Sequence, residues 1–172
     1  MPPGISVVAV RTHLARPTTR ERLIETRTCT DMGLRMIHEL QVKDGLPHDQ
    51  NGNPLSTVTP EDYVERYRDR MPSKITSKAF LSQFGTIRGL DDGDATRDIY
   101  KVRSRAEHHI YENKRVHDFA TYLSRARRAE NLQDLIEAGE LMYASHWSYS
   151  QRCGIGGVET DRLVSAIRKQ GV

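Results

Sequence analysis

The residues best suited to do chemistry lie near the end of the chain, where His146, Ser148 and Ser150 follow one another within GELMYASHWSYS. A histidine among serines could form a nucleophilic pair, because an imidazole can take the proton of an attacking hydroxyl. The spacing argues against this use. Residues two apart on a helix point to different sides, and no carboxylate is placed to orient His146. We therefore predict a buried or capping role and assign no catalytic residue.

A set of histidines and a glycine-rich turn are weak candidates for metal or nucleotide binding. The histidines His108, His109 and His117 lack the i, i+4 spacing with an acid that zinc sites use, so we predict no metal ligands. The glycine-rich turn at residues 154–157 has no Lys-Ser/Thr continuation and no preceding strand, which excludes a phosphate-binding P-loop. We expect this turn to be a tightly packed helix cap.

The elements that must position these residues are nearly all helical. Hydrophobic periodicity and capping signals predict helices over residues 18–41, 60–70, 77–84, 103–128, 132–149 and 159–170. Residues 5–10 (ISVVAV) are β-branched and predict one N-terminal strand, which needs neighbours to satisfy its backbone groups. Taken alone, the chain is expected to be a mostly α single domain over residues 1–172, a helical bundle with one strand.

Two of these helices carry patterns that predict how they pack. Gly33 lies inside the first helix, where glycine costs about 1 kcal/mol relative to alanine, so we expect another element to approach closely there. The helix at 132–149 has an apolar stripe at helical spacing, formed by Leu132, Leu135, Ile136, Gly139 and Met142.

Composition and charge argue against several classes of function but do not identify one. The 172 residues carry a formal net charge of +3, and charged residues make up 28%. The arginines of the first helix alternate with acids and lack aromatic neighbours for base stacking, so nucleic-acid binding is not favoured. The two cysteines, Cys29 and Cys153, form no metal or disulfide pattern, and no apolar run is as long as a membrane helix. We expect a cytoplasmic protein with no membrane partner.

Four sequence blocks, in this order, resemble the C-terminal region of GHMP sugar kinases, in the branch of the L-arabinokinases and galactokinases. They are DMGLRMI (31–37), PEDYVERYRDRMPSKITSKAFLSQFG (60–85), RAEHHIYENKRVHDFATYL (105–123), and GELMYASHWSYS followed by ETDRLV. The resemblance implies that the chain is part of the α+β C-terminal domain of such a kinase. It also implies, for the complete protein, ATP- and magnesium-dependent phosphorylation of a monosaccharide hydroxyl.

The resemblance also implies what this chain lacks. Family members use a Gly/Ser-rich phosphate loop, an aspartate that acts on the sugar hydroxyl, and a second glycine-rich loop near the C-terminus. None of these motifs occurs in this sequence, which ends about where we expect the last strand and loop to begin. Because phosphoryl transfer depends on positioning and charge stabilisation, we expect the chain to be inactive alone and to bind no cofactor by itself. The expected partners are the sugar and the missing N-terminal kinase half.

The resemblance implies three candidate residues for sugar binding, because each matches a position in the family's motifs. Arg11 and His13 match the family's V-[RK]-H-[SA] segment, although both could instead satisfy local backbone groups at the strand end. Arg27 matches an arginine that follows the family's sugar-contacting tyrosine, but this sequence has no tyrosine before Tyr63.

Two alternatives to the kinase function stay open: a non-catalytic helical interaction module derived from the kinase fold, and a basic nucleic-acid-binding helical domain.

Overall fold

The computed structural model describes residues 8–10, 20–46, 54–90, 99–129 and 131–170. Contacts group these residues into two compact units, and the predicted single domain over residues 1–172 stays a prediction. The central unit contains the described residues of Arg20–Tyr111, and the C-terminal unit contains the described residues from Glu112 onward together with residues 8–10. Each unit is described by itself.

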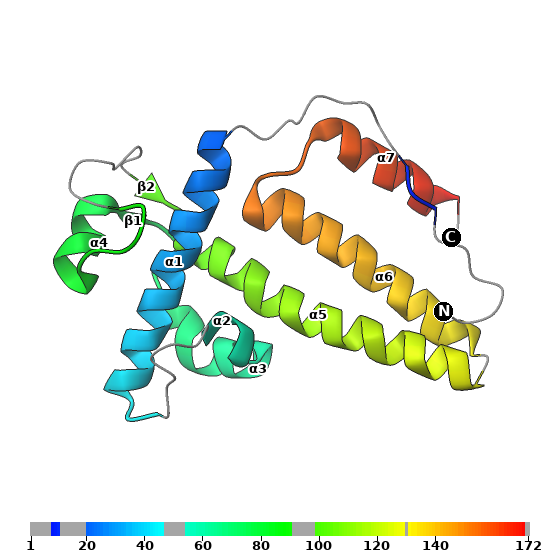
Figure 1. Cartoon of the computed structure of the whole chain (residues 1–172), viewed down its shortest axis with the longest axis horizontal. Coiled ribbons are helices and arrows are strands. Elements are labelled where there is room, and N and C mark those ends of the chain that lie inside the picture. The colour runs from blue at the N-terminus through cyan, green and yellow to red at the C-terminus, as the bar shows by residue number, and fades with distance from the viewer. Residues whose placement is uncertain (1–7, 11–19, 47–53, 91–98, 130, 171–172) are drawn as a thin grey trace. The chain divides into compact units, whose positions relative to one another are not determined.

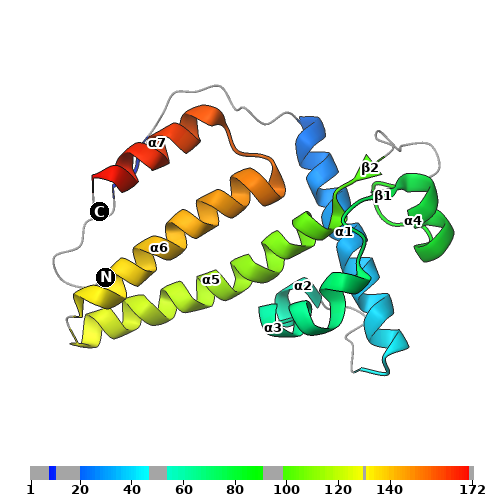
Figure 2. The ribbon, with the colours of Figure 1, turned by 180° about the vertical axis from the view of Figure 1, so that it is seen from behind.

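The described chain is mostly helical, as predicted (Figures 1 and 2). Its elements are α1 (Arg20–Lys43), α2 (Pro54–Thr57), α3 (Pro60–Asp62), η1 (Tyr63–Tyr67), η2 (Arg68–Arg70), β1 (Ile75–Thr76), α4 (Ser77–Phe84), β2 (Ile99–Tyr100), α5 (Val102–Ala129), α6 (Leu132–Ser148), η3 (Tyr149–Cys153) and α7 (Val158–Lys169). Helical segments begin and end within two residues of each predicted helix, except that η3 extends the fifth. The short helix α2 lies outside all of the predicted helices.

The strand prediction needs correction. Val8 and Val10 are described, belong to no strand, and are 80% and 58% exposed, while residues 5–7 lie outside the described residues. The strands that the structure does contain are β1 and β2, which pair antiparallel with Ile75 opposite Tyr100. A strand of two residues is too short to show an alternating pattern, so sequence reasoning missed both.

Side-chain caps explain where several helices begin. The Thr59 hydroxyl accepts a hydrogen bond from the Asp62 amide at 3.1 Å, and Pro60 occupies the first helical turn, where a missing N–H costs nothing. The Asn131 side chain likewise accepts from the Gln133 amide at 3.0 Å and starts α6. Both helices begin where the sequence predicts them, at residues 60 and 132.

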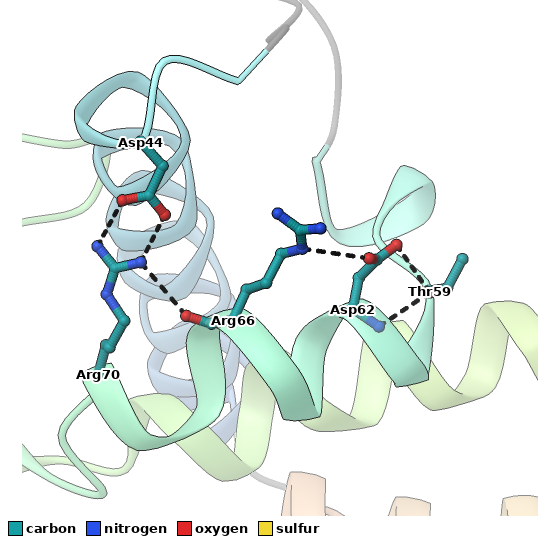
Figure 3. Close-up of polar contacts among 5 residues, drawn as sticks. All are labelled: Asp44, Thr59, Asp62, Arg66 and Arg70. Atoms are coloured by element: carbon teal, nitrogen blue, oxygen red, sulfur yellow. Dashed lines mark hydrogen bonds and ion pairs between the residues drawn. The ribbon is translucent and has the colours of Figure 1, made fainter.

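An arginine joins the end of α1 to the helical segment at residues 60–70 (Figure 3). Arg70 donates to both carboxylate oxygens of Asp44, at 2.5 and 2.9 Å, and to the carbonyl oxygen of Arg66 at 3.4 Å. The Arg70 guanidinium lowers the pKa of the Asp44 carboxyl. Because exposed pairs contribute little stability, the contact mainly fixes the direction in which the two segments meet.

The hydrophobic core lies in the central unit. Its largest fully buried side chains come from α1, η1, α4, β2 and the start of α5, and include Met32, Tyr63, Phe80, Tyr100 and Ile110. Gly33 makes the crossing of α1 and α5 possible. A Cβ atom built on it would lie 2.8 Å from the Cβ of Ala106, which is closer than real carbon atoms approach. The predicted close packing at Gly33 is confirmed.

The C-terminal unit has no comparable core among its described residues. Its buried apolar side chains are small: Ala126, Ala138 and Cys153. Three members of the apolar stripe predicted on α6 are exposed, Leu132 by 69%, Ile136 by 51% and Met142 by 63%, whereas Leu135 is half-buried. Apolar surface gathered on one helix face normally marks a contact with another element or partner.

Replacement of Gly33 by alanine tests the helix crossing. Helix propensity alone would stabilise the protein by up to about 1 kcal/mol. We expect Gly33→Ala instead to lower the free energy of unfolding by about 1–3 kcal/mol, because the new methyl group overlaps a fixed one. Urea unfolding followed by circular dichroism measures the change.

Gly139→Ala is the matched control, since nothing lies within 4 Å of a Cβ atom at that helical position. It should be neutral or stabilising, and adding Ala106→Gly to Gly33→Ala should restore part of the lost stability. A stabilising Gly33→Ala would show that the two helices do not cross at this distance.

Candidate functional site

A carboxylate of α7 joins two polar side chains near the end of α6. His146 Nε2 lies 2.8 Å from Asp161 Oδ1, and the Ser150 hydroxyl donates to the same oxygen at 2.6 Å. The expectation that His146 has no orienting carboxylate is therefore wrong. Asp161 lies 15 positions later in the chain and comes close because the chain reverses direction between α6 and α7. Sequence spacing along one helix could not reveal it.

The glycine-rich turn at residues 154–157 produces this reversal. Gly154 has φ of 68°, a left-handed conformation that favours glycine, and ends η3. A Cβ atom on Gly156 would lie 2.0 Å from Ser150 Oγ and 2.8 Å from Ser150 Cα, so only glycine fits there. Gly157 then precedes α7, and its amide donates to Thr160 Oγ1 at 3.2 Å. The predicted tightly packed helix cap is confirmed.

A second polar contact joins α5 to α6 within the same unit. Arg115 donates to Glu112 Oε2 from Nε at 2.8 Å and from Nη2 at 2.6 Å. The Ser145 hydroxyl donates to the other oxygen, Glu112 Oε1, at 2.5 Å. The Arg115 side chain is only 13% exposed, so this pair is better shielded from water than the surface ion pairs of the chain. We call these residues, with His146, Ser150 and Asp161, the polar network.

An open groove of about 460 Å³ lies beside the polar network. It is lined by apolar and polar side chains of α5, α6 and η3: Val116, Phe119, Leu141, Met142, Glu112, Arg115, Ser145, His146 and Tyr149. Apolar walls with a few polar groups are the usual composition of small-molecule and peptide sites. The groove is therefore a candidate site in the described part of the C-terminal unit.

The polar network is not arranged for nucleophilic catalysis. In a catalytic triad the histidine stands between the serine and the carboxylate and takes the serine proton. Here Ser150 donates directly to Asp161 Oδ1, and His146 Nε2 contacts that same oxygen. The serine proton is thus held by the carboxylate and does not reach the imidazole. What the arrangement does is join α6, η3 and α7.

The groove does not fit the magnesium ion that ATP chemistry uses. Mg²⁺ requires several oxygen ligands in octahedral arrangement. The one carboxylate lining the groove, Glu112, is already held by Arg115 and Ser145. Within the described part of the chain, no three His, Cys, Asp or Glu residues gather as a metal site would need.

The three residues predicted to bind sugar are not brought together by the described structure. Arg11 and His13 lie outside the described residues. Arg27 is an exposed residue of α1 in the central unit, one turn before Asp31. Their proposed role stays a prediction.

Comparison with known proteins indicates a region related to a sugar kinase. L-arabinokinase of Arabidopsis thaliana is 34% identical to this chain over 119 residues, a match that covers 66% of this chain and 11% of that protein. The chain thus corresponds to about a tenth of the length of this relative. No protein-family model and no solved structure matches the chain.

No helix in the described residues combines the length and apolar character needed to cross a bilayer.

Removal of the Asp161 carboxylate tests whether the polar network holds α7. Asp161→Ala deletes both contacts to Oδ1, and we expect it to lower the stability of the C-terminal unit by about 1–2 kcal/mol, given partial exposure to water. Trp147 is the chain's single tryptophan and is followed directly by the segment that these contacts hold, so its fluorescence during urea unfolding reports the change.

Glu159→Ala is the control in the same helical turn. Glu159 is exposed, and its change should stay within about 0.5 kcal/mol. Equal effects of the two substitutions would mean that Asp161 acts only as a negative charge near the start of α7.

Proposed function

We propose that this chain is a portion of the C-terminal half of a GHMP-type sugar kinase and supplies its helical part. The observation that carries the proposal is the 34% identity over 119 residues to an L-arabinokinase. The polar network supports it, because Glu112 and Arg115, Ser145 and His146, and Asp161 come from three sequence segments of the kinase-like blocks. Residues that resemble the family at separate places are in contact.

In the complete protein, ATP and magnesium would supply the phosphoryl group to a monosaccharide hydroxyl. The residues of this chain would not perform that step, because the phosphate-binding motifs are not in its sequence. Their contribution would be structural: α5, α6 and α7 would form a helical layer whose exposed apolar stripe is covered by the remaining kinase. The partners of the chain would be that remaining part and, through Arg11, His13 or Arg27, the sugar. We place this protein in the cytoplasm.

A non-catalytic interaction module is the second candidate. The observation that favours it is the exposed apolar face of the C-terminal unit, which could bind another protein without any kinase chemistry. Both candidates predict that the chain alone transfers no phosphate, so an assay of the chain alone does not separate them.

The first experiment is an ATP-consumption assay on the purified chain with a panel of monosaccharides that includes L-arabinose and D-galactose. We expect no turnover above a control without sugar. Turnover that depends on a sugar would contradict the proposal, because it would require a phosphate site built from residues of this chain.

A chimera separates the two candidates. The matching region of Arabidopsis L-arabinokinase is replaced by the corresponding residues of this chain, and L-arabinose-dependent ATP consumption is compared with the parent and with a deletion of that region. If the chain has kept its place in the kinase, the folded chimera should turn over well above the deletion. A folded chimera no more active than the deletion would favour the interaction module.

A further inference from the structure

An aspartate followed by a glycine comes directly after α1, and this pair of residues is chemically labile. The helix ends at Lys43, and Asp44 and Gly45 follow it. The side chain of an aspartate and the amide nitrogen of the next residue can close a five-membered ring. A glycine at the second position has no side chain to hinder this closure. The same dipeptide occurs at Asp92-Gly93, which lies outside the described residues, so the structure shows the surroundings of the first pair.

Backbone hydrogen bonds hold the peptide group between Asp44 and Gly45 in place. Gly45 has φ of 65°, and its amide donates to the carbonyl oxygen of Val42 at 3.1 Å. The amide of Leu46 donates to the carbonyl oxygen of Gln41 at 2.9 Å. Two such bonds around a left-handed glycine form the Schellman motif, which ends many helices. Ring closure would have to break this cap, because the Gly45 nitrogen must lose its proton and turn towards the Asp44 side chain.

Arg70 holds both oxygens of the Asp44 carboxylate (Figure 3). Its Nη1 donates to Oδ2 at 2.5 Å and its Nη2 donates to Oδ1 at 2.9 Å, so the orientation of the carboxylate is fixed. These hydrogen bonds, together with the charge of Arg70, lower the pKa of the Asp44 carboxyl. Ring closure expels the hydroxyl of a protonated carboxyl group. A contact that favours the ionised form therefore opposes the reaction.

We propose that Asp44 is a site of spontaneous isoaspartate formation, which Arg70 and the cap of α1 suppress while the central unit is folded. In the reaction the Gly45 nitrogen bonds to Asp44 Cγ, and the hydroxyl of the protonated carboxyl leaves with the amide proton as water. Water then adds to the main-chain carbonyl carbon of the cyclic imide and breaks its bond to nitrogen. The chain afterwards continues through Cγ. No atom is gained or lost overall, and the reaction needs no oxidant and no cofactor.

The product is incompatible with the contact that joins α1 to the helical segment at residues 60–70. Isoaspartate adds one carbon atom to the main chain at the cap, and its free carboxylate is attached to Cα. The Schellman hydrogen bonds and the paired hydrogen bonds from Arg70 both depend on the ordinary main chain at Asp44. A chain that forms the product while it is locally open therefore does not regain this contact when it closes again. The proposal does not depend on any kinase function of the chain.

Peptide mapping of the whole chain after long incubation at neutral pH tests the site. Isoaspartate and aspartate have the same mass, so the product is detected by the shifted retention of the peptide that contains residue 44. Methylation of that peptide by an isoaspartyl methyltransferase confirms it. We expect slow formation in buffer and much faster formation in guanidinium chloride, where the cap and the Arg70 contact are lost. Absence of the product at residue 44 in the denaturant, or equal rates in the two conditions, overturns the proposal.

Replacement of Arg70 separates its protection from that of the fold as a whole. We expect Arg70→Gln to form isoaspartate at residue 44 in buffer about fivefold faster or more, as loss of a hydrogen bond predicts. Arg35→Gln is the matched control, because it removes an exposed ion pair with Glu39 within α1 and should leave the rate unchanged. An unchanged rate in Arg70→Gln, or equal acceleration by Arg35→Gln, would show that Arg70 does not protect the site.

Circular dichroism establishes that both variants are folded before their rates are compared. Should Arg70→Gln not fold, Arg70→Lys takes its place in the same comparison, because lysine keeps the charge but cannot form the paired hydrogen bonds. Its rate at residue 44 should also exceed that of the parent chain, and an equal rate contradicts the proposal.

Discussion

The uneven burial of apolar side chains is the constraint on which the rest of the structure depends. Burial of apolar surface is the main force that holds a fold together, and this chain concentrates it in the central unit. There, Met32, Tyr63 and Phe80 are fully enclosed, and Gly33 lets two helices approach at a distance that any side chain would prevent. The C-terminal unit buries only small apolar side chains among those described, and its long helix α6 leaves Leu132, Ile136 and Met142 exposed.

Polar contacts therefore contribute more to holding the helices of the C-terminal unit in place. Asp161 joins α7 to His146 and Ser150, and Glu112 joins α5 to Ser145. Such contacts contribute little to the free energy of unfolding, because part of each is open to water. Their main effect is to fix how the helices are oriented and aligned against one another. The exposed apolar side chains of α6 are compatible with the proposal that this chain is a portion of a larger kinase. What the comparison itself shows is a region related to a sugar kinase, with 34% identity over 119 residues.

Much of the fold could be predicted from sequence, because helix starts and periodic apolar residues are local signals. Thr59-Pro60 and Asn131 begin helices where expected, and Gly33 indicated a close approach before its partner Ala106 was known. The contacts of the candidate site were harder to predict from the sequence. Asp161 reaches His146 only through the chain reversal between α6 and α7, and Glu112 and Ser145, which are 33 positions apart, come from two different helices. Spacing along one helix contains no information on either contact.

Hydrogen exchange of the intact chain, followed by mass spectrometry, tests most directly the claim that the two units differ in how well they are held together. Exchange in a well-packed core requires nearly global unfolding, whereas helices without a core open locally. We expect the amides of α1 around Met32 and Met36 to be protected far more strongly than those of α6 and α7. Equal protection in both units would contradict the claim, because it would show that the C-terminal unit is already complete and needs no covering partner.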